Sequence, residues 1–218
     1  MSRPPAGLPY HGRVSDDRPA DLLDLLRAER SEPDREGTPP DDAQLAELLE
    51  TATTVPDHGG LEPWRFVVVR GPGRDRFGDA LVAGLVGERG PELPDPVVAK
   101  MRGKAFAAPC QVVLVASPQV GTNVPRWEQV ASASCTGYAL VLAATALGLG
   151  AIWKSAPVLH TAPVRELFGT GPDEELLGWV NLGTPAGPRR DRARQAPPWS
   201  SHVTVLDGPA LRQPDRAA

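Results

Sequence analysis

The sequence predicts an α+β fold, in which helices mix with strands without regular β–α–β alternation. Two observations carry this prediction. Short apolar segments of strand length stand among longer segments whose leucines have helical spacing. In addition, Glu128 and Lys154 enclose 25 consecutive positions without a charged side chain. A helix in that segment, ended by Gly148 and Gly150, would be apolar on every side and therefore enclosed.

Three environments could enclose such a helix: a bilayer, a large protein core or the core of an oligomer. A bilayer span needs roughly 20 predominantly apolar residues, so length alone would permit one. The first turns, from Ala131 to Gly137, hold small and weakly polar residues that add little transfer free energy. Small residues instead let helices approach closely. We therefore expect a buried central helix that leads into a strand.

Composition excludes several classes of protein. The 218 residues suffice for one domain with a sizeable core, and a net charge of −4 gives no reason to expect nucleic acid or an anionic membrane as a partner. The first residues lack the apolar segment of a signal peptide, so a cytoplasmic location is expected. Cys110 and Cys135 lack metal-ligand spacing and are expected to be buried free thiols.

Residues 1–18 are rich in proline, glycine and charge and are expected to be poorly ordered. A leucine stripe from Pro19 to Arg30 predicts the first helix. Two later strands are mostly apolar, which predicts burial on both faces. The further predicted elements are, in chain order, a helix over Ala43–Ala52 capped by Asp41 or Asp42, a strand over Trp64–Arg70, a helix over Asp75–Val86, a basic helical segment over Val97–Ala107, a strand over Gln111–Ser117, the central helix, a strand over Ala151–Ser155, a helix over Thr161–Phe168, a strand over Leu176–Gly183 and a short strand over His202–Leu206.

The sequence has no Walker loop, GxSxG, HExxH or paired cysteine motif. The candidates for a binding site are therefore four local clusters of polar residues. Arg30 and Ser31 close the first helix, where they suit either a bound phosphate or an ordinary helix C-terminus. His58 lies in a turn before a strand. It could donate to a ligand, or it could cap the turn while Asp57 makes an Asx turn.

The other two clusters are also cationic. Lys154 and Ser155 follow Trp153 at the end of the predicted third strand, and a buried lysine there would need an anionic or polar partner. A basic run after Gly183 suits either a solvated loop or a phosphate site. It consists of Arg189, Arg190, Arg192 and Arg194.

In their order and spacing, VPDHGGLEPWRFVVVRG, VPRWEQ, the helix ending in GLGAIWKS, and WVNLGTP resemble the short bacterial NAD(P)H-dependent members of the FMN-binding nitroreductase family, over roughly residues 20–206. The resemblance implies a nitroreductase-like α+β fold with a central, mostly antiparallel sheet flanked by helices, in an intertwined homodimer. It implies one domain over 19–207, between the N-terminal tail and a flexible C-terminal tail over 208–218.

The resemblance also implies an oxidoreductase with FMN at the subunit interface and NAD(P)H as hydride donor. A nitroaromatic or quinone-like acceptor would then replace the nicotinamide in a ping-pong cycle. The flavin carries the redox chemistry, so no side chain is expected to act as nucleophile or acid–base catalyst. Lys154 is expected to act as an electrostatic stabiliser. Two alternatives remain: a flavin-dependent dehydrogenase in a biosynthetic pathway, or a non-catalytic dimer without tight FMN binding. No metal, nucleic acid or membrane partner is implied.

Carried over position by position, the family pattern assigns eight residues to the cofactor: Glu29, Arg30, Ser31, Thr54, His58, Trp153, Lys154 and Ser155. Three of them, Glu29, Thr54 and Lys154, stand where the family has arginine. A carboxylate that faces a phosphate is repulsive by about a kcal/mol or more at short range. Arg27, Arg35 or the later arginines are the candidates to take over the phosphate.

Overall fold

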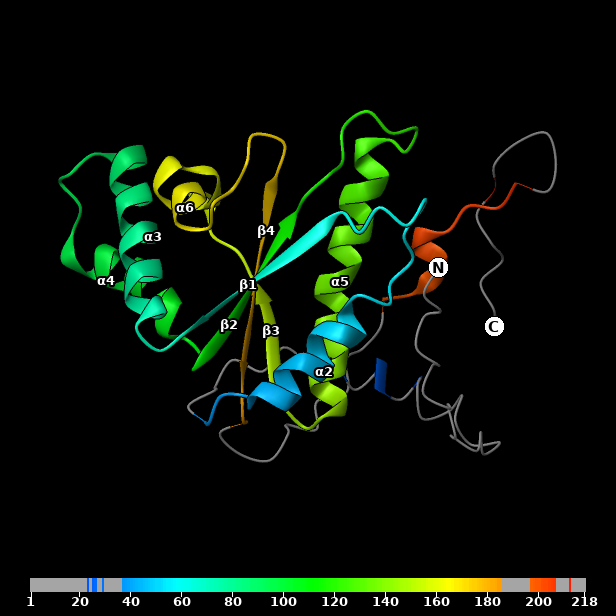
Figure 1. Cartoon of the computed structure of the whole chain (residues 1–218), viewed down its shortest axis with the longest axis horizontal. Coiled ribbons are helices and arrows are strands. Elements are labelled where there is room, and N and C mark those ends of the chain that lie inside the picture. The colour runs from blue at the N-terminus through cyan, green and yellow to red at the C-terminus, as the bar shows by residue number, and fades with distance from the viewer. Residues whose placement is uncertain are drawn as a thin grey trace, which may run out of the picture. The chain divides into compact units, whose positions relative to one another are not determined.

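The structure is a computed structural model, and it describes residues 23, 25, 26, 29, 37–185, 197–206 and 212. The chain divides into two units, residues 29–189 and the two chain ends, 1–28 with 190–218. The elements of the first unit are α2 (Asp42–Ala52), β1 (Trp64–Arg70), α3 (Gly73–Arg89), α4 (Asp95–Gly103), η1 (Lys104–Phe106), β2 (Cys110–Ala116), α5 (Arg126–Ala146), β3 (Gly150–Lys154), η2 (Pro157–His160), α6 (Ala162–Leu167) and β4 (Glu175–Gly183) (Figure 1).

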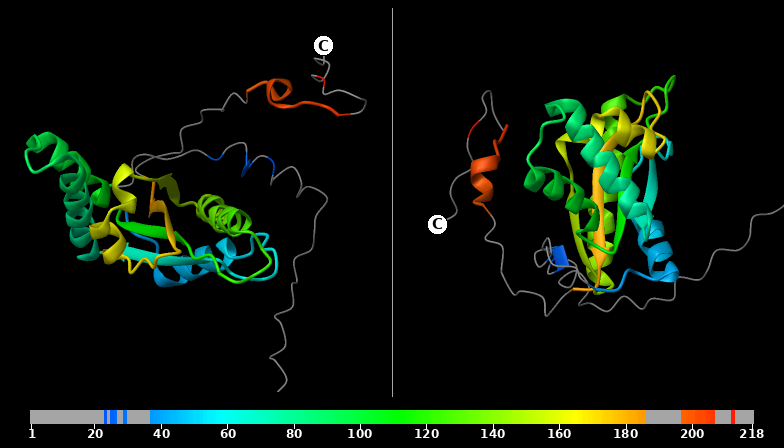
Figure 2. Two further views of the ribbon diagram at one scale, coloured as in Figure 1. Left: turned by 90° about the horizontal axis from the view of Figure 1, so that it is seen from above. Right: turned by 90° about the vertical axis from the view of Figure 1, so that its left-hand side faces the viewer.

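The four strands form one antiparallel sheet in the order β1-β2-β4-β3. Helices α3, α4 and α6 cover one face, and α2 and α5 cover the other (Figures 1 and 2). Successive residues of β2 point to opposite faces. Val113 therefore packs with Phe77 of α3, and Val112 packs with Leu140 of α5. The predicted α+β class and antiparallel sheet are confirmed.

The two apolar strands differ in burial. Every residue of β2 is buried, as the sequence predicts. β1 has the predicted bounds, but most of its side chains are only half-buried. The prediction of burial on both faces is wrong for β1, because it lies at the edge of the sheet and pairs with β2 alone.

The helices follow the predicted pattern with shifted ends. Asp41 caps α2 through a capping box with Gln44, as one of the two predicted caps. The predicted basic segment divides at Gly103 into α4 and η1. Beyond the first unit, the described leucines Leu23, Leu25 and Leu26 are helical, in agreement with the predicted first helix.

Helix α5 is 21 residues long and ends before Gly148, which has φ +73°. One chain does not enclose it on every side, which leaves the core of an oligomer among the environments considered above. Trp127 and Tyr138 are 69% and 47% exposed, and Ala131 and Cys135 are exposed in the same line. These four residues, at spacings of four, four and three, form a single exposed stripe, named here the α5 stripe. In the part of the chain that the structure describes, no helix is long and apolar enough to cross a membrane.

The two cysteines are free thiols, but only Cys110 is buried as predicted. Burial raises the pKa of the Cys110 thiol to about 11, against an opposing effect of Arg70. Cys135 is exposed because its place in α5 falls on the stripe that the sheet does not cover.

The predicted strand over His202–Leu206 is wrong. Its start belongs to a 3₁₀ helix, η3 (Trp199–His202), and Val205 forms a single isolated bridge with Arg212. Pro198 precedes η3 with φ −55°, a value that suits the start of a helical turn. The tails over 1–18 and 208–218 lie outside the described residues, apart from Arg212.

Candidate functional site

The candidate site lies at one end of the sheet. The register places the first residue of β1, the last of β2 and the first of β4 side by side. The segment after β2 lies against the turn before β1, since Ser117 N–H donates to the Pro63 carbonyl at 2.9 Å and Gln119 Nε2 donates to the Leu61 carbonyl at 2.6 Å. Two loops therefore share this region. The end of β3 lies further along the sheet, because its last residue, Lys154, pairs with Trp179, four residues into β4.

Trp153, at the end of β3, is fixed from both sides. Its Nε1 donates to the Leu177 carbonyl at 3.1 Å, which is available because β4 has a bulge between the partners of Leu114 and Val115. On the other side the ring packs at Gly137 of α5, where an added Cβ would come within 2.8 Å of it. The indole is thus a rigid wall between α5 and β4.

Gly178 makes this arrangement possible. It has φ +121°, and a Cβ built on it would clash with the Lys154 carbonyl oxygen. Only glycine fits both conditions without strain. Lys154 and Ser155 then follow as exposed residues at the strand end. Lys154 is therefore not a buried cation that needs a partner, because β3 is an edge strand and the side chain leaves the sheet at its last pair.

Helix α5 holds His58 in place. The Nδ1 atom of His58 lies 2.8 Å from Oε2 of Glu128 in this helix, and the His58 residue as a whole remains exposed. One turn further along the helix, Ser132 Oγ donates to the Pro56 carbonyl at 2.9 Å. Residues 128 and 132 lie on one helix face, so a single face of α5 orients the whole turn.

The turn itself is closed by Asp57, whose Oδ2 accepts from the backbone N–H of Glu62 at 2.6 Å. Glu62 has φ +48°, an uncommon value for a non-glycine residue. The Asx turn expected as the structural alternative for Asp57 is not what forms, because this carboxylate accepts from a residue five positions along the chain and not two. His58 does not cap the turn but pairs with Glu128, which leaves Nε2 directed away from that pair.

The buried Gln129 fixes the loop that precedes α5. Its Oε1 accepts from Gln119 N–H at 2.7 Å, and its Nε2 donates to the carbonyls of Gln119 and Val124. The sequence did not assign roles to Glu128, Gln129 and Ser132. A usable signal was present for two of them, because the polar residues Glu128 and Ser132 stand four positions apart in a mostly small and apolar helix.

A second polar cluster braces this end of the sheet. Arg65 donates from Nε and Nη2 to the two carboxylate oxygens of Glu174, at 2.7 and 2.6 Å. Ser117 Oγ and Gly171 N–H also donate to that carboxylate. The hydrogen bonds from Arg65, followed by those of Ser117 and Gly171, lower the pKa of Glu174 to about 2 against the effect of burial.

The remaining candidates are placed less completely. Thr54 is exposed just after α2, and its Oγ1 donates to the Thr51 carbonyl at 2.8 Å. Glu29 is half-buried. Arg30, Ser31 and the basic run at 189–194 lie outside the described residues. Among the residues that are described, no group of three or more His, Cys, Asp or Glu side chains could hold a metal ion.

The described candidate residues offer hydrogen-bond donors and positive charge, but within one chain they do not contact one another. No hydrogen bond or ion pair within residues 37–185 joins any two of Thr54, His58 and Lys154. Lys154 and Ser155 provide a cation and a hydroxyl beside an indole wall. His58 is exposed and lies apart from this set, where it pairs with Glu128.

Comparison with known proteins identifies relatives. A model described as the Nitroreductase family matches residues 36–184. An Escherichia coli (strain K12) protein named "Putative NAD(P)H nitroreductase YdjA" is 36% identical over 165 residues, which cover 76% of this chain and 88% of that protein.

Solved structures share the fold. The nitroreductase-like family protein from Bacillus cereus has a TM-score of 0.69 at 21% identity, and the match covers 93% of this chain and 100% of that one. The FMN-dependent nitroreductase NfnB from Mycobacterium smegmatis, in complex with NADPH, has a TM-score of 0.66 at 18% identity, with coverage of 88% and 100%.

Proposed function

Because the chain belongs to the nitroreductase family, we propose that it is an FMN-dependent oxidoreductase that passes hydride from NAD(P)H to a nitroaromatic or quinone-like acceptor. The E. coli relative is named for NAD(P)H and for nitroreduction, and the M. smegmatis structure is named for FMN and NADPH. The single observation that carries the proposal is the end of β3, where Trp153 and Ser155 match the family pattern and Lys154 keeps the positive charge of its arginine.

The residues at the end of β3 fit a flavin. Lys154 offers an exposed cation, Ser155 a hydroxyl and Trp153 a flat wall, and a reduced flavin carries negative charge that a fixed cation stabilises. We assign Thr54 and His58 to the binding of the same cofactor. At the phosphate end we assign Arg30 and Ser31 as donors. Glu29 fits a phosphate poorly, because a carboxylate repels it.

When bound, FMN supplies the hydride chemistry. The chain's own residues therefore bind the cofactor, orient it and keep water away from it. Lys154 places positive charge at the cofactor edge. Glu128 holds the Nδ1 side of His58 and thereby fixes the ring, which leaves Nε2 to donate or accept. No side chain of this site has to act as a nucleophile or as a general acid or base.

The α5 stripe supports a homodimer. Its exposed residues include a tryptophan and a tyrosine, and exposed apolar patches of this kind mark protein–protein contacts. A second copy of the chain would enclose α5 as its composition requires. It would also bring His58 of one subunit toward the β3 end of the other, which accounts for the separation of these residues within one chain.

Steady-state kinetics test the proposed activity. NAD(P)H oxidation should be stimulated by menadione and by a nitrofuran, with parallel double-reciprocal plots that indicate a ping-pong order in which the nicotinamide leaves before the acceptor binds. A flavin-loaded enzyme that turns over neither acceptor would contradict the proposal and favour a dehydrogenase with one dedicated substrate. We place this reaction in the cytoplasm.

A further inference from the structure

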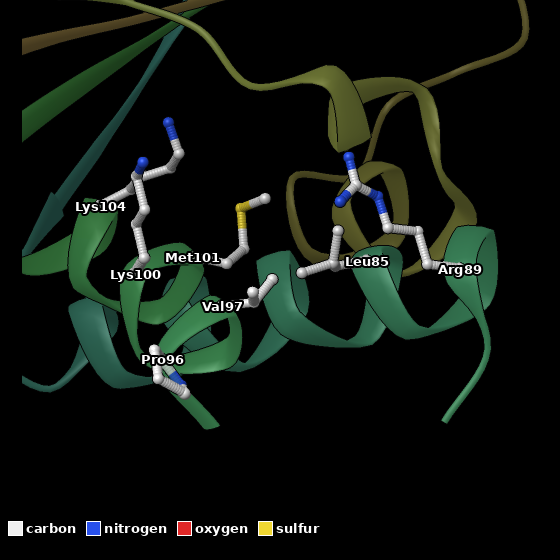
Figure 3. Close-up of a pocket in the computed structure, with 7 residues that line it drawn as sticks. All are labelled: Leu85, Arg89, Pro96, Val97, Lys100, Met101 and Lys104. Carbon is white, nitrogen blue, oxygen red and sulfur yellow. The ribbon is translucent and has the colours of Figure 1, made fainter. Parts of the chain in front are cut away.

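A pocket lies between α3 and α4 (Figure 3), two helices that cover the face of the sheet opposite α5 (Figure 1). Its volume is about 410 Å³, within the range that small-molecule sites occupy. The lining residues are Leu85, Arg89, Pro96, Val97, Lys100, Met101 and Lys104. None of them belongs to the flavin site proposed above.

The lining combines an apolar floor with a basic rim. Met101 and Leu85 are buried and Val97 is half-buried, and they lie between Arg89 at one end and the two lysines at the other (Figure 3). Lys100 and Lys104 are four residues apart along α4 and η1, which brings their side chains to the same side of the helix.

The positive charge of the rim is not neutralised within the described part of the chain. No ion pair or hydrogen bond is formed there by the Arg89 guanidinium or by the ammonium groups of Lys100 and Lys104. Glu88, the acidic residue next to Arg89, is engaged by His160 at 2.9 Å. In a chain of net charge −4, three unpaired cations around one apolar cavity are a local reversal of charge.

From this combination we propose that the α3–α4 pocket is a second binding site, for a small molecule with an apolar body and a carboxylate head. The apolar body would cover Met101, Val97 and Leu85, whose burial is favourable. The carboxylate would bind at Lys100 and Lys104 through charge-assisted hydrogen bonds. This inference does not depend on the proposed oxidoreductase activity.

Calorimetric titration with decanoate tests the site. Decanoate should bind the purified full chain at about one equivalent. The double variant Lys100→Gln/Lys104→Gln should bind about tenfold more weakly or worse, because each lost contact involves a charge. Arg76→Gln is the matched control, since Arg76 is an exposed cation of α3 outside the pocket. It should leave the affinity unchanged.

Three further ligands separate the possible causes. Decanol lacks the charge and inorganic phosphate lacks the apolar body, so neither should bind at concentrations that saturate the site with decanoate. FMN should not displace decanoate. The inference is overturned by absence of saturable decanoate binding, by equal binding of decanol or phosphate, by displacement with FMN, or by an equal loss in Arg76→Gln. Val97→Trp, which fills the floor, should abolish binding and checks the location independently.

Discussion

Lys154 is the residue on which the account of the cofactor depends most. It is exposed at the end of β3, next to an indole that α5 and β4 hold rigidly. A free cation beside the cofactor suits the stabilisation of negative charge on a bound ring. Lysine keeps the charge of the family's arginine but lacks its bidentate geometry.

Lys154→Ala should weaken FMN binding about tenfold or slow flavin reduction by NAD(P)H, because a contact to a charged group is lost. Flavin fluorescence quenching measures the first quantity and stopped-flow absorbance the second. Lys154→Arg should retain both, and Arg76→Ala on α3 is the control for a change of net charge. Normal flavin content and a normal reduction rate in Lys154→Ala would remove Lys154 from the site.

Glu29 is the residue that departs most from the family pattern. If it faces the phosphate, Glu29→Arg should tighten FMN binding by roughly fivefold or more, since a repulsion becomes an attraction. Glu29→Gln should fall between the two. An equilibrium titration with FMN measures the effect, and an unchanged or weaker affinity in Glu29→Arg would show that Glu29 does not face the phosphate.

At the scale of elements, β4 positions the end of β3 through its bulge. Gly178→Ala should lower the free energy of unfolding by about 2 kcal/mol, because the backbone is strained for a residue with a Cβ and the new atom meets the Lys154 carbonyl. Gly87→Ala, at an open position of α3, should instead stabilise the chain by about 0.5–1 kcal/mol. Urea unfolding measures both, and equal effects would contradict the role of the bulge.

The Arg65–Glu174 cluster braces the same end of the sheet and predicts acid sensitivity. The folded-state pKa of Glu174 is lowered from 4.5 to about 2, so its contribution to stability is complete above about pH 4.5 and is lost as the pH falls towards 2. The melting temperature of the wild type should therefore exceed that of Glu174→Gln at pH 6. This difference should shrink steadily below pH 4.5, and a constant difference down to about pH 2 would contradict the assignment.

Whether a segment forms a helix or a strand was largely predictable from the sequence. How far its side chains are buried was not. Short runs of apolar residues indicated all four sheet strands, because such runs record which side chains a strand buries. The half-burial of β1 and the exposure of Lys154 depend on which strands lie at the sheet edges, which local sequence does not encode. His202–Leu206 has strand-like alternation, yet it pairs at a single bridge, since a strand also needs a partner.

At the scale of the whole molecule, α5 links the fold to the site. Its inner face packs on the sheet, its face at Glu128 and Ser132 orients the His58 turn, and the α5 stripe remains exposed in one chain. The sequence showed that a charge-free helix needs to be enclosed, but it could not show which side stays open. That side follows from the tertiary arrangement, and the proposed homodimer supplies its cover.

The central claim is that this chain binds FMN, and direct titration of the purified protein tests it. The account predicts saturable binding at about one FMN per chain, with quenched or shifted flavin fluorescence and a higher melting temperature of the complex. A colourless protein that neither binds added FMN nor gains thermal stability from it would contradict the account. It would point instead to a dimer that has lost its cofactor.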